Sequence, residues 1–398
     1  MKFPKIEQHN LLLDIFESID GIPKICDQLY FKDTQKIYYR SPGSGPYPEN
    51  DHTIYSIKFI PGYLYVDYKN DPQNNLRATR YGQEKGYAVN VRDISDLDDY
   101  LRKQLRSSYA KSIKRSVNRL ETCFDVRYSM YYGDIDKGHY DELMESLLHM
   151  IITRFKQRNE TSASIKNWEQ RCKNTYPLIL EKRASLFVIY NGQEPISISL
   201  NYHFGKIHFS YISSYNIDYS KFGMGHIDIY KQLEWCISNN YSIFEMGWGT
   251  LDYKIRWCNL IYNFEHHLAV YKKSLPELLL FPLLGLKIRL KSYLIAKNAH
   301  VYLKKIKDKL KSKQDVGQET FYSVEAMGKT VYMGNATIID YKSKEFDSLR
   351  KLVYDFLYSN SLHEKNIKVY KFLHKNSFII KGGQIVQKID LNSKNTRS

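Results

Sequence analysis

The pattern of hydrophobic and polar positions predicts short strands in the first hundred residues. The segments 53–59 and 63–67 are rich in the aromatic and β-branched residues that favour strands. Proline and glycine punctuate the loops around them, most densely at 41–46. We therefore expect this region to consist mainly of strands joined by turns.

The pattern then changes to that of two helices. Acidic residues at 96–99 are followed by basic residues up to position 119, and this order suits the dipole of a single helix. From His139 to Phe155, apolar residues recur at intervals of three and four, as on one face of a helix. The sequence therefore predicts a basic helix followed by an amphipathic one.

From Leu186 onward, strands and helices are expected in a fixed order. A tight hairpin turn is predicted at Asn191-Gly192, because this pair favours two-residue loops. The order indicates a mixed sheet with helices, in the α/β (α+β) class. The expected elements are strands at 186–190, 196–202 and 207–216, a loop, a helix at 226–239, a strand at 243–248, a short helix at 252–257 and a strand at 263–272.

The C-terminal part divides into a basic arm and a small domain. The arm, residues 275–313, has a helical pattern. After Gly317 we expect a strand at 331–340, a helix at 345–359 and a closing pair of strands within 378–389. The basic residues of the arm are Lys287, Arg289, Lys291, Lys297, Lys304, Lys305, Lys307, Lys309, Lys311 and Lys313.

Charge adds a second observation to this organisation. The chain has 398 residues, of which 43% are hydrophobic, enough for two or three folded domains. Its net charge is +16, and residues 101–125 and 276–315 carry most of it. Such concentration implies an anionic partner: a phosphate ligand, a nucleic acid or an acidic membrane surface. The alternative is that these lysine-rich helix faces are simply solvated.

Several classes of protein are excluded by what the sequence lacks. The cysteines form no CxxC pair, which argues against a zinc ribbon and a disulfide framework. Adjacent His266 and His267 would point to opposite faces of a strand, so we expect no metal site. Neither HExxH nor GxSxG occurs. Without a signal peptide or an apolar stretch of about eighteen residues, we expect a cytoplasmic protein.

One loop carries a pattern typical of phosphate binding. Residues 220–225 join a strand to a helix and contain Gly223-Met224-Gly225. Glycines allow a ligand to approach the backbone, and the start of a helix presents free N–H groups to an anion such as pyrophosphate. A P-loop is excluded because its Gly-Lys-Ser/Thr ending is missing. A dinucleotide fingerprint is disfavoured because residue 228 is aspartate.

Around this loop the sequence resembles the GNAT acyltransferase superfamily, and within it the CelD-type acetyltransferases and their FemAB-like relatives. The loop is similar to the family's Gln/Arg-x-x-Gly-x-Gly/Ala element, with Ser220 in the leading position. The helix 109–120 and the strand from Tyr211 also resemble this branch. The stretch 244–257 is similar to the signature Phe-Asp-Phe-Gly-x-Gly…Tyr-Lys-x-x-Trp, with Glu245 replacing the aspartate.

The resemblance covers roughly residues 95–272 and implies a domain organisation. Members of this branch resemble pairs of GNAT-like units in tandem, which implies a GNAT-like acyltransferase fold here. The expected domains are a degenerate N-terminal unit at 1–130, an acyltransferase unit at 131–274, a basic helical arm at 275–315 and a small C-terminal α/β domain at 316–398.

The resemblance also implies a site for acetyl-CoA or another acyl-CoA. From the residues themselves, Glu245 is expected to be the general base and Tyr253 the proton donor to the leaving thiolate, while one of Lys254 and Arg256 would meet phosphate and the other would be solvated. The alternatives are that Glu245 is a solvated strand-end carboxylate or pairs with Lys254, and that Tyr253 belongs to the core. The residues expected to hold the donor are Lys221, Phe222, Gly223, Met224, Gly225 and His226, with backbone N–H groups at Ser213 and Ser214 for the oxyanion.

Three functions remain open at this point. The first is an N-acyltransferase acting on a small-molecule or sugar amine, such as an envelope or polysaccharide precursor. The second is a FemAB-like transferase that uses aminoacyl-tRNA, with basic helices on RNA phosphates. The third is a non-catalytic GNAT-like module at the inner face of the membrane, anchored by the apolar residues 278–281 beside the basic arm. In the alternative, these leucines pack beneath the acyltransferase domain.

Overall fold

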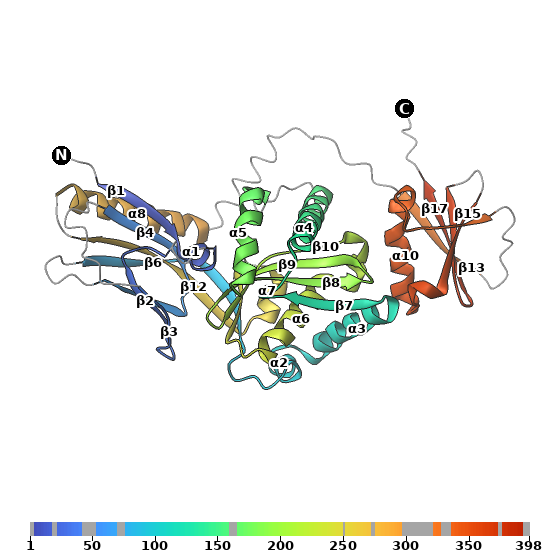
Figure 1. Cartoon of the computed structure of the whole chain (residues 1–398), viewed down its shortest axis with the longest axis horizontal. Helices are drawn as coiled ribbons and strands as arrows, with labels where there is room; N and C mark the ends of the chain where they lie inside the picture. The colour runs from blue at the N-terminus through green and yellow to red at the C-terminus, as the bar shows by residue number, and fades with distance from the viewer. Residues whose placement is uncertain are drawn as a thin grey trace, which may run out of the picture.

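The protein is described here from a computed structural model, which covers residues 4–17, 22–41, 53–69, 76–158, 165–249, 251–271, 275–296, 321–327, 336–372 and 376–392. A mixed nine-stranded sheet forms its centre (Figure 1), which confirms the expected α/β fold with a mixed sheet. In spatial order, its strands are β1 (Lys5–Asn10), β4 (Thr53–Ile60), β12 (Leu260–Tyr271), β6 (Leu76–Asn90), β11 (Ile243–Trp248), β10 (Ile207–Tyr215), β9 (Glu194–Phe204), β8 (Ala184–Asn191) and β7 (Val126–Tyr131).

Strand β6 joins the two halves of this sheet. It pairs antiparallel with β12 along its length and with β11 near its end. Strand β12, late in the chain, lies between β4 and β6, two strands from the first hundred residues. A second sheet packs beside this half and contains β3 (Ile37–Arg40), β2 (Cys26–Phe31) and β5 (Leu64–Tyr68).

Helices cover both faces of the central sheet. The apolar core on one face includes α1 (Leu11–Glu17), α4 (Lys137–Gln157) and α5 (Trp168–Leu180). On the other face are α2 (Leu97–Gln104), α3 (Ser107–Cys123) and α6 (Met224–Ser238). The helix α6 connects β10 to its parallel neighbour β11, as a crossover between parallel strands requires.

The basic helix expected from residue 96 is two helices. Leu105 and Arg106 both adopt extended ψ angles, 147° and 137°, so the helical hydrogen-bond ladder stops between α2 and α3. Leu105 is buried in the core that also receives Ile113. The break between α2 and α3 therefore allows the side chain of Leu105 to turn into the core.

The C-terminal domain is a five-stranded sheet with one helix. Its strands, in spatial order, are β13 (Phe321–Met327), β17 (Ile385–Asn392), β16 (Ser377–Gly382), β15 (Ile367–Phe372) and β14 (Ala336–Ile339), and its helix is α10 (Asp347–Asn360). The sequence predicted α10 and the strand pair β16–β17. It missed β13 and β15, since Lys368 and Lys371 interrupt the apolar pattern of β15. Part of the strand expected at 331–340 is β14.

The basic arm begins as α8 (Leu275–Ala296), which packs against β12 and β6. Lys297 and the lysines from 304 to 313 lie outside the described residues. Within the part of the chain that is described, no helix is long and apolar enough to cross a membrane.

Candidate functional site

The central sheet opens between β10 and β11. The two parallel strands pair at only three positions, and the last pair joins Phe209 to Glu245. Beyond this point β10 has a bulge between Ser210 and Ile212, and β11 has one between Glu245 and Trp248. Because bulges bend and twist a strand, the two strands stop pairing at this point, and we call the unpaired stretch between them the opening.

A partly exposed phenol, that of Tyr253, follows this opening in the chain. Tyr253 belongs to α7 (Asp252–Trp257), directly after β11, and is 37% exposed. Burial raises the pKa of its hydroxyl, Arg154 of α4 lowers that pKa, and Asp228 of α6 raises it. Charges from helices on both faces of the sheet thus act on this hydroxyl.

Asp228 is a buried carboxylate with three neutral partners. Its Oδ1 accepts a hydrogen bond from Ser199 Oγ at 2.7 Å, and its Oδ2 accepts from Ser213 Oγ at 3.2 Å and Gln232 Nε2 at 2.8 Å. Within the described residues, no cation lies within 4 Å of this carboxylate. Burial therefore raises the pKa of Asp228 to about 6. Ser213 is exposed, so it links the carboxylate to the solvent side of the opening.

The face of β9 beneath α6 is polar and buried. It is formed by every second residue of the strand: Ser197, Ser199, Asn201 and His203. Further along α6, Gln232 accepts a hydrogen bond at 3.0 Å from Nε2 of buried His208. Asp228 is thus held in a network of uncharged polar groups, and not in an apolar pocket.

Glu245, the expected base, has no exposed surface and accepts three hydrogen bonds. The hydroxyls of Tyr63 and Tyr262 donate to its Oε2 at 2.8 and 2.7 Å, and the Gly247 N–H donates to Oε1 at 2.6 Å. Burial raises the pKa of Glu245, and these hydrogen bonds act against that rise. The contacts tie the β11 bulge to β12 and to the loop before β5.

Lys254 also holds the bulge. Its Nζ donates to the carbonyls of Met246 and Trp248, both at 2.7 Å, and the side chain is buried. Burial lowers the pKa of Lys254, and the charge of Glu245 raises it. These two residues form no ion pair within 4 Å. The lysine therefore satisfies two carbonyls near the bulge, and its contact with a phosphate stays a prediction.

The expected donor loop has one packed side and one open side. Residues 217–222 form a 3₁₀ helix, and Gly223 adopts a φ of 73° before α6 begins. Phe222 and Met224 are fully buried, and Lys221 Nζ donates to Asp355 O and Ser359 Oγ of α10 at 3.3 and 2.9 Å. Phe222 and Met224 are thus directed into the core, whereas Lys221 lies on the surface and contacts α10.

The open side consists of Gly225 and its neighbours. Gly225 is exposed, and a Cβ placed there would meet no atom within 4 Å. His226 Nδ1 accepts a hydrogen bond from Trp257 Nε1 at 3.0 Å, so its Nε2 carries the proton and faces the Tyr109 hydroxyl at 3.2 Å. Ser116 of α3 lies 3.7 Å from the Cβ position of Gly223, so α3 borders the loop.

A basic groove of about 430 Å³ runs along α3. Two of its cations are already engaged: Lys114 pairs with Asp98 at 2.6 Å, and Arg119 donates to Tyr358 O at 2.7 Å. The groove is lined by Lys111, Lys114, Arg115, Asn118, Arg119, Thr122 and Ser361. It contains no apolar side chain.

The family comparison bears on the part of the chain that contains this opening. Residues 107–255 match the acetyltransferase (GNAT) domain family. This segment is a GNAT-type domain. This matched segment, called the GNAT domain below, includes β10, β11, α6 and nearly all the site residues described above.

Curated proteins and solved structures give weaker comparisons. No curated protein matches the chain. A conserved protein from Bacteroides thetaiotaomicron is 8% identical over 55% of this chain and 70% of its own, with a TM-score of 0.36. FemX is 8% identical over 46% of this chain and 61% of its own, with a TM-score of 0.36. A C-terminal DUF2156 domain from Agrobacterium fabrum is 9% identical over 56% and 69%, with a TM-score of 0.36.

The GNAT domain thus contains some residues that the sequence singled out and others that it missed. Tyr253, Ser213 and Gly225 lie on open surfaces, whereas Glu245 and Lys254 are bound within the frame. Ser214 is buried, and its Oγ has no partner among the described residues. Arg154 and Asp228 were missed. The only available signal was an aspartate on the apolar face of the amphipathic helix that is now α6. The oxyanion role of the backbone at Ser213 and Ser214 stays a prediction.

Proposed function

We propose that the GNAT domain transfers an acyl group, such as acetyl, from acyl-CoA to an amine at the opening between β10 and β11. The observation that carries this proposal is the partly exposed phenol of Tyr253, which follows β11 and whose pKa responds to the charges of Arg154 and Asp228. Donor and acceptor entering from opposite faces would meet at this hydroxyl. A small-molecule or sugar amine, as in envelope precursors, is the proposed acceptor.

The residues at the opening suit direct transfer. The amine nitrogen attacks the thioester carbonyl carbon, the carbon–sulfur bond breaks, and the thiolate takes the phenolic proton of Tyr253. The proton released by the nitrogen passes to Ser213 Oγ as the hydroxyl proton of Ser213 moves to Asp228. Proton exchange with solvent then restores Tyr253 and Asp228. Ser213 would contact the amine, and Asp228 would act through it.

We assign Glu245 and Lys254 to the frame of the site. Their hydrogen bonds hold the β11 bulge that separates the two strands. A carboxylate that already accepts three hydrogen bonds and has no exposed surface is poorly placed to take a proton from a bound amine. The base assignment of Glu245 stays a hypothesis that its matched substitution tests.

Replacing Gly225 by valine should abolish donor binding without unfolding the protein. The added side chain has room in the free protein but would occupy the space in which a pyrophosphate approaches the start of α6. We expect the affinity for acetyl-CoA, measured by calorimetry, to fall about 100-fold, equivalent to the loss of roughly 3 kcal/mol. Thiol release from acetyl-CoA in the presence of amino sugars should fall with it.

Gly82→Val is the matched control, because a Cβ at Gly82 also meets no atom within 4 Å. This variant should bind acetyl-CoA like the wild type. Unchanged donor affinity in Gly225→Val would remove the loop from the donor site. If the wild-type protein neither binds acetyl-CoA nor releases its thiol, the acyl-CoA proposal itself fails.

The basic groove favours a second candidate, a transferase that uses aminoacyl-tRNA. Its lining of cations without aromatic rings suits contacts to a nucleic-acid backbone and not to bases. If about three phosphates are bound, a plot of the logarithm of the tRNA association constant against the logarithm of the salt concentration should have a slope of about −3. The double variant Lys111→Gln with Arg115→Gln should lower that slope by about two. A salt-independent affinity would exclude this candidate.

A further inference from the structure

One face of α8 is fixed to the sheet. Phe281 is buried in a small core with Ile54, Leu268 and Val270. Gly285 packs so tightly on Tyr81 that a Cβ would lie 2.2 Å from the tyrosine hydroxyl oxygen. The helix is therefore held close against β4, β12 and β6 by one side only (Figure 1).

The opposite face of α8 exposes a line of leucines. Leu279, Leu283, Leu286 and Leu290 are 57–70% exposed. Their spacing of four, three and four residues places them on a single stripe along the helix. Monomeric soluble proteins seldom leave such a contiguous apolar stripe in water, so this face is suited to a partner.

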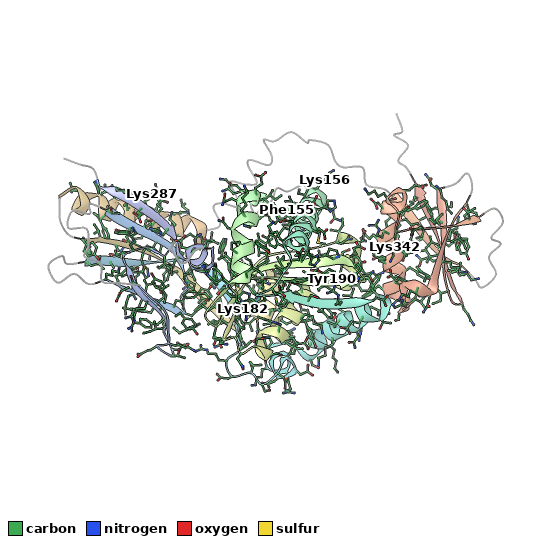
Figure 2. The ribbon with its side chains drawn as sticks, viewed as in Figure 1. Phe155, Lys156, Lys182, Tyr190, Lys287 and Lys342 are labelled. Atoms are coloured by element: carbon green, nitrogen blue, oxygen red, sulfur yellow. The ribbon has the colours of Figure 1, made fainter. Side chains whose placement is uncertain are left out.

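Basic side chains accompany the stripe. Lys287 and Arg289 flank it on its two sides by helical geometry, and Lys291 lies beyond Lys287. All three are exposed, and Figure 2 shows Lys287 at the outer edge of the molecule. Burial and the nearby charges of Lys291 and Lys287 lower the pKa of Lys58 on β4, so positive charge accumulates here. Within the described residues, no acidic side chain lies within 4 Å of the amino groups of these lysines.

We infer that α8 docks on an anionic lipid membrane, with its leucines at the boundary of headgroups and acyl chains and its cations on lipid phosphates. An apolar stripe between basic flanks is the arrangement of helices that lie in a membrane surface. The inference goes beyond the proposed function, since it concerns where the enzyme works and not what it transfers.

Charge decides between a membrane and a second copy of the chain. If two α8 helices paired along their leucines, Lys287 and Arg289 would occupy the positions that flank the seam. Like charges from the two copies would then meet. An anionic surface instead attracts each of these cations. The pattern therefore favours lipid over self-association.

Co-sedimentation of the full chain with vesicles tests this inference. We expect binding to vesicles that contain phosphatidylglycerol and weak binding to pure phosphatidylcholine. The triple variant Lys287→Gln, Arg289→Gln and Lys291→Gln should lower the affinity for the anionic vesicles roughly 100-fold. The triple variant Leu283→Ser, Leu286→Ser and Leu290→Ser should lower it at least about 10-fold.

A matched control is available at the other end of the molecule. Ile338 and Ile385 of the C-terminal domain are also exposed, and changing both to serine should leave vesicle binding unchanged. Thermal unfolding will show whether each variant is folded, which is expected because every changed side chain faces outward. Equal or negligible binding to both vesicle types would overturn the inference. So would a wild-type dimer in sedimentation velocity that the leucine variant dissociates. Neither result depends on acyl transfer.

Discussion

Exchanging Asp228 for asparagine should make the protein more stable at neutral pH and slower in acyl transfer. Asparagine can keep the hydrogen bonds to Ser199, Ser213 and Gln232 by orienting its oxygen toward the Gln232 amide and letting the serine hydroxyls rotate. It removes the buried charge, which no cation offsets. Turnover should fall about 10-fold or more, because Ser213 loses the group that accepts its proton.

The pH dependence of unfolding gives the sign of this effect. The pKa of Asp228 is about 6 in the folded protein against an ordinary value of 3.8. The folded state therefore holds the proton more tightly than the unfolded chain. The resulting stability is present below about pH 4 and is lost as the pH rises through 6, by about 3 kcal/mol. Asp228→Asn should not show this loss.

Denaturant unfolding at pH 4.5 and 7.5 measures the difference. The wild type should lose more stability than Asp228→Asn between these two values, and at pH 7.5 the variant should be the more stable protein. Asp93→Asn, which changes an exposed carboxylate, should follow the wild type in stability and turnover. Parallel pH profiles for the wild type and Asp228→Asn would show that Asp228 is not a strained buried acid.

The same change at Glu245 should have the opposite result. The carboxylate accepts from two tyrosine hydroxyls and from the Gly247 N–H, so three donors converge on it. In Glu245→Gln, the amide oxygen can accept from both tyrosines only if the amide NH₂ group faces the Gly247 N–H. Two buried hydrogen-bond donors then face each other without an acceptor. We expect a loss of about 2 kcal/mol in the free energy of unfolding.

Chemical denaturation of Glu245→Gln beside Glu145→Gln measures this loss, since Glu145 is an exposed glutamate on α4. The folded Glu245 variant should keep turnover within about 10-fold of the wild type, because no proton passes through the carboxylate. A variant with unchanged stability and turnover lower by about 100-fold or more would restore Glu245 as the general base.

The sequence predicted the order of elements from 186 to 257 well, because strands and helices there have clear periods. It did not predict which faces of the strands are exposed to solvent. The alternation in β9 is typical of a half-exposed strand, yet Ser197, Ser199 and Asn201 are all buried. Neighbouring strands and helices on both faces cover β9, and a single strand's pattern carries no information about what covers its polar side.

The candidate site was predictable in part for a related reason. The glycines of the loop and the position of Tyr253 follow from local order along the chain. The partners of Glu245 come from β12 and from the loop before β5, which lie 17 and 182 residues away in sequence. A carboxylate in an apolar strand indicates a special role, but only its distant partners separate a base from a structural acid. The same holds for Asp228, whose partners lie on two strands and its own helix.

The insertion of β12 between β4 and β6 determines the order in which the sheet can be completed during synthesis. Until residues 260–271 leave the ribosome, β4 and β6 each have an unpaired edge facing the gap. Such edges are prone to pair with other chains. The N-terminal strands must therefore wait for a segment that follows the GNAT domain, so we expect the two halves of the sheet to fold together and not in succession.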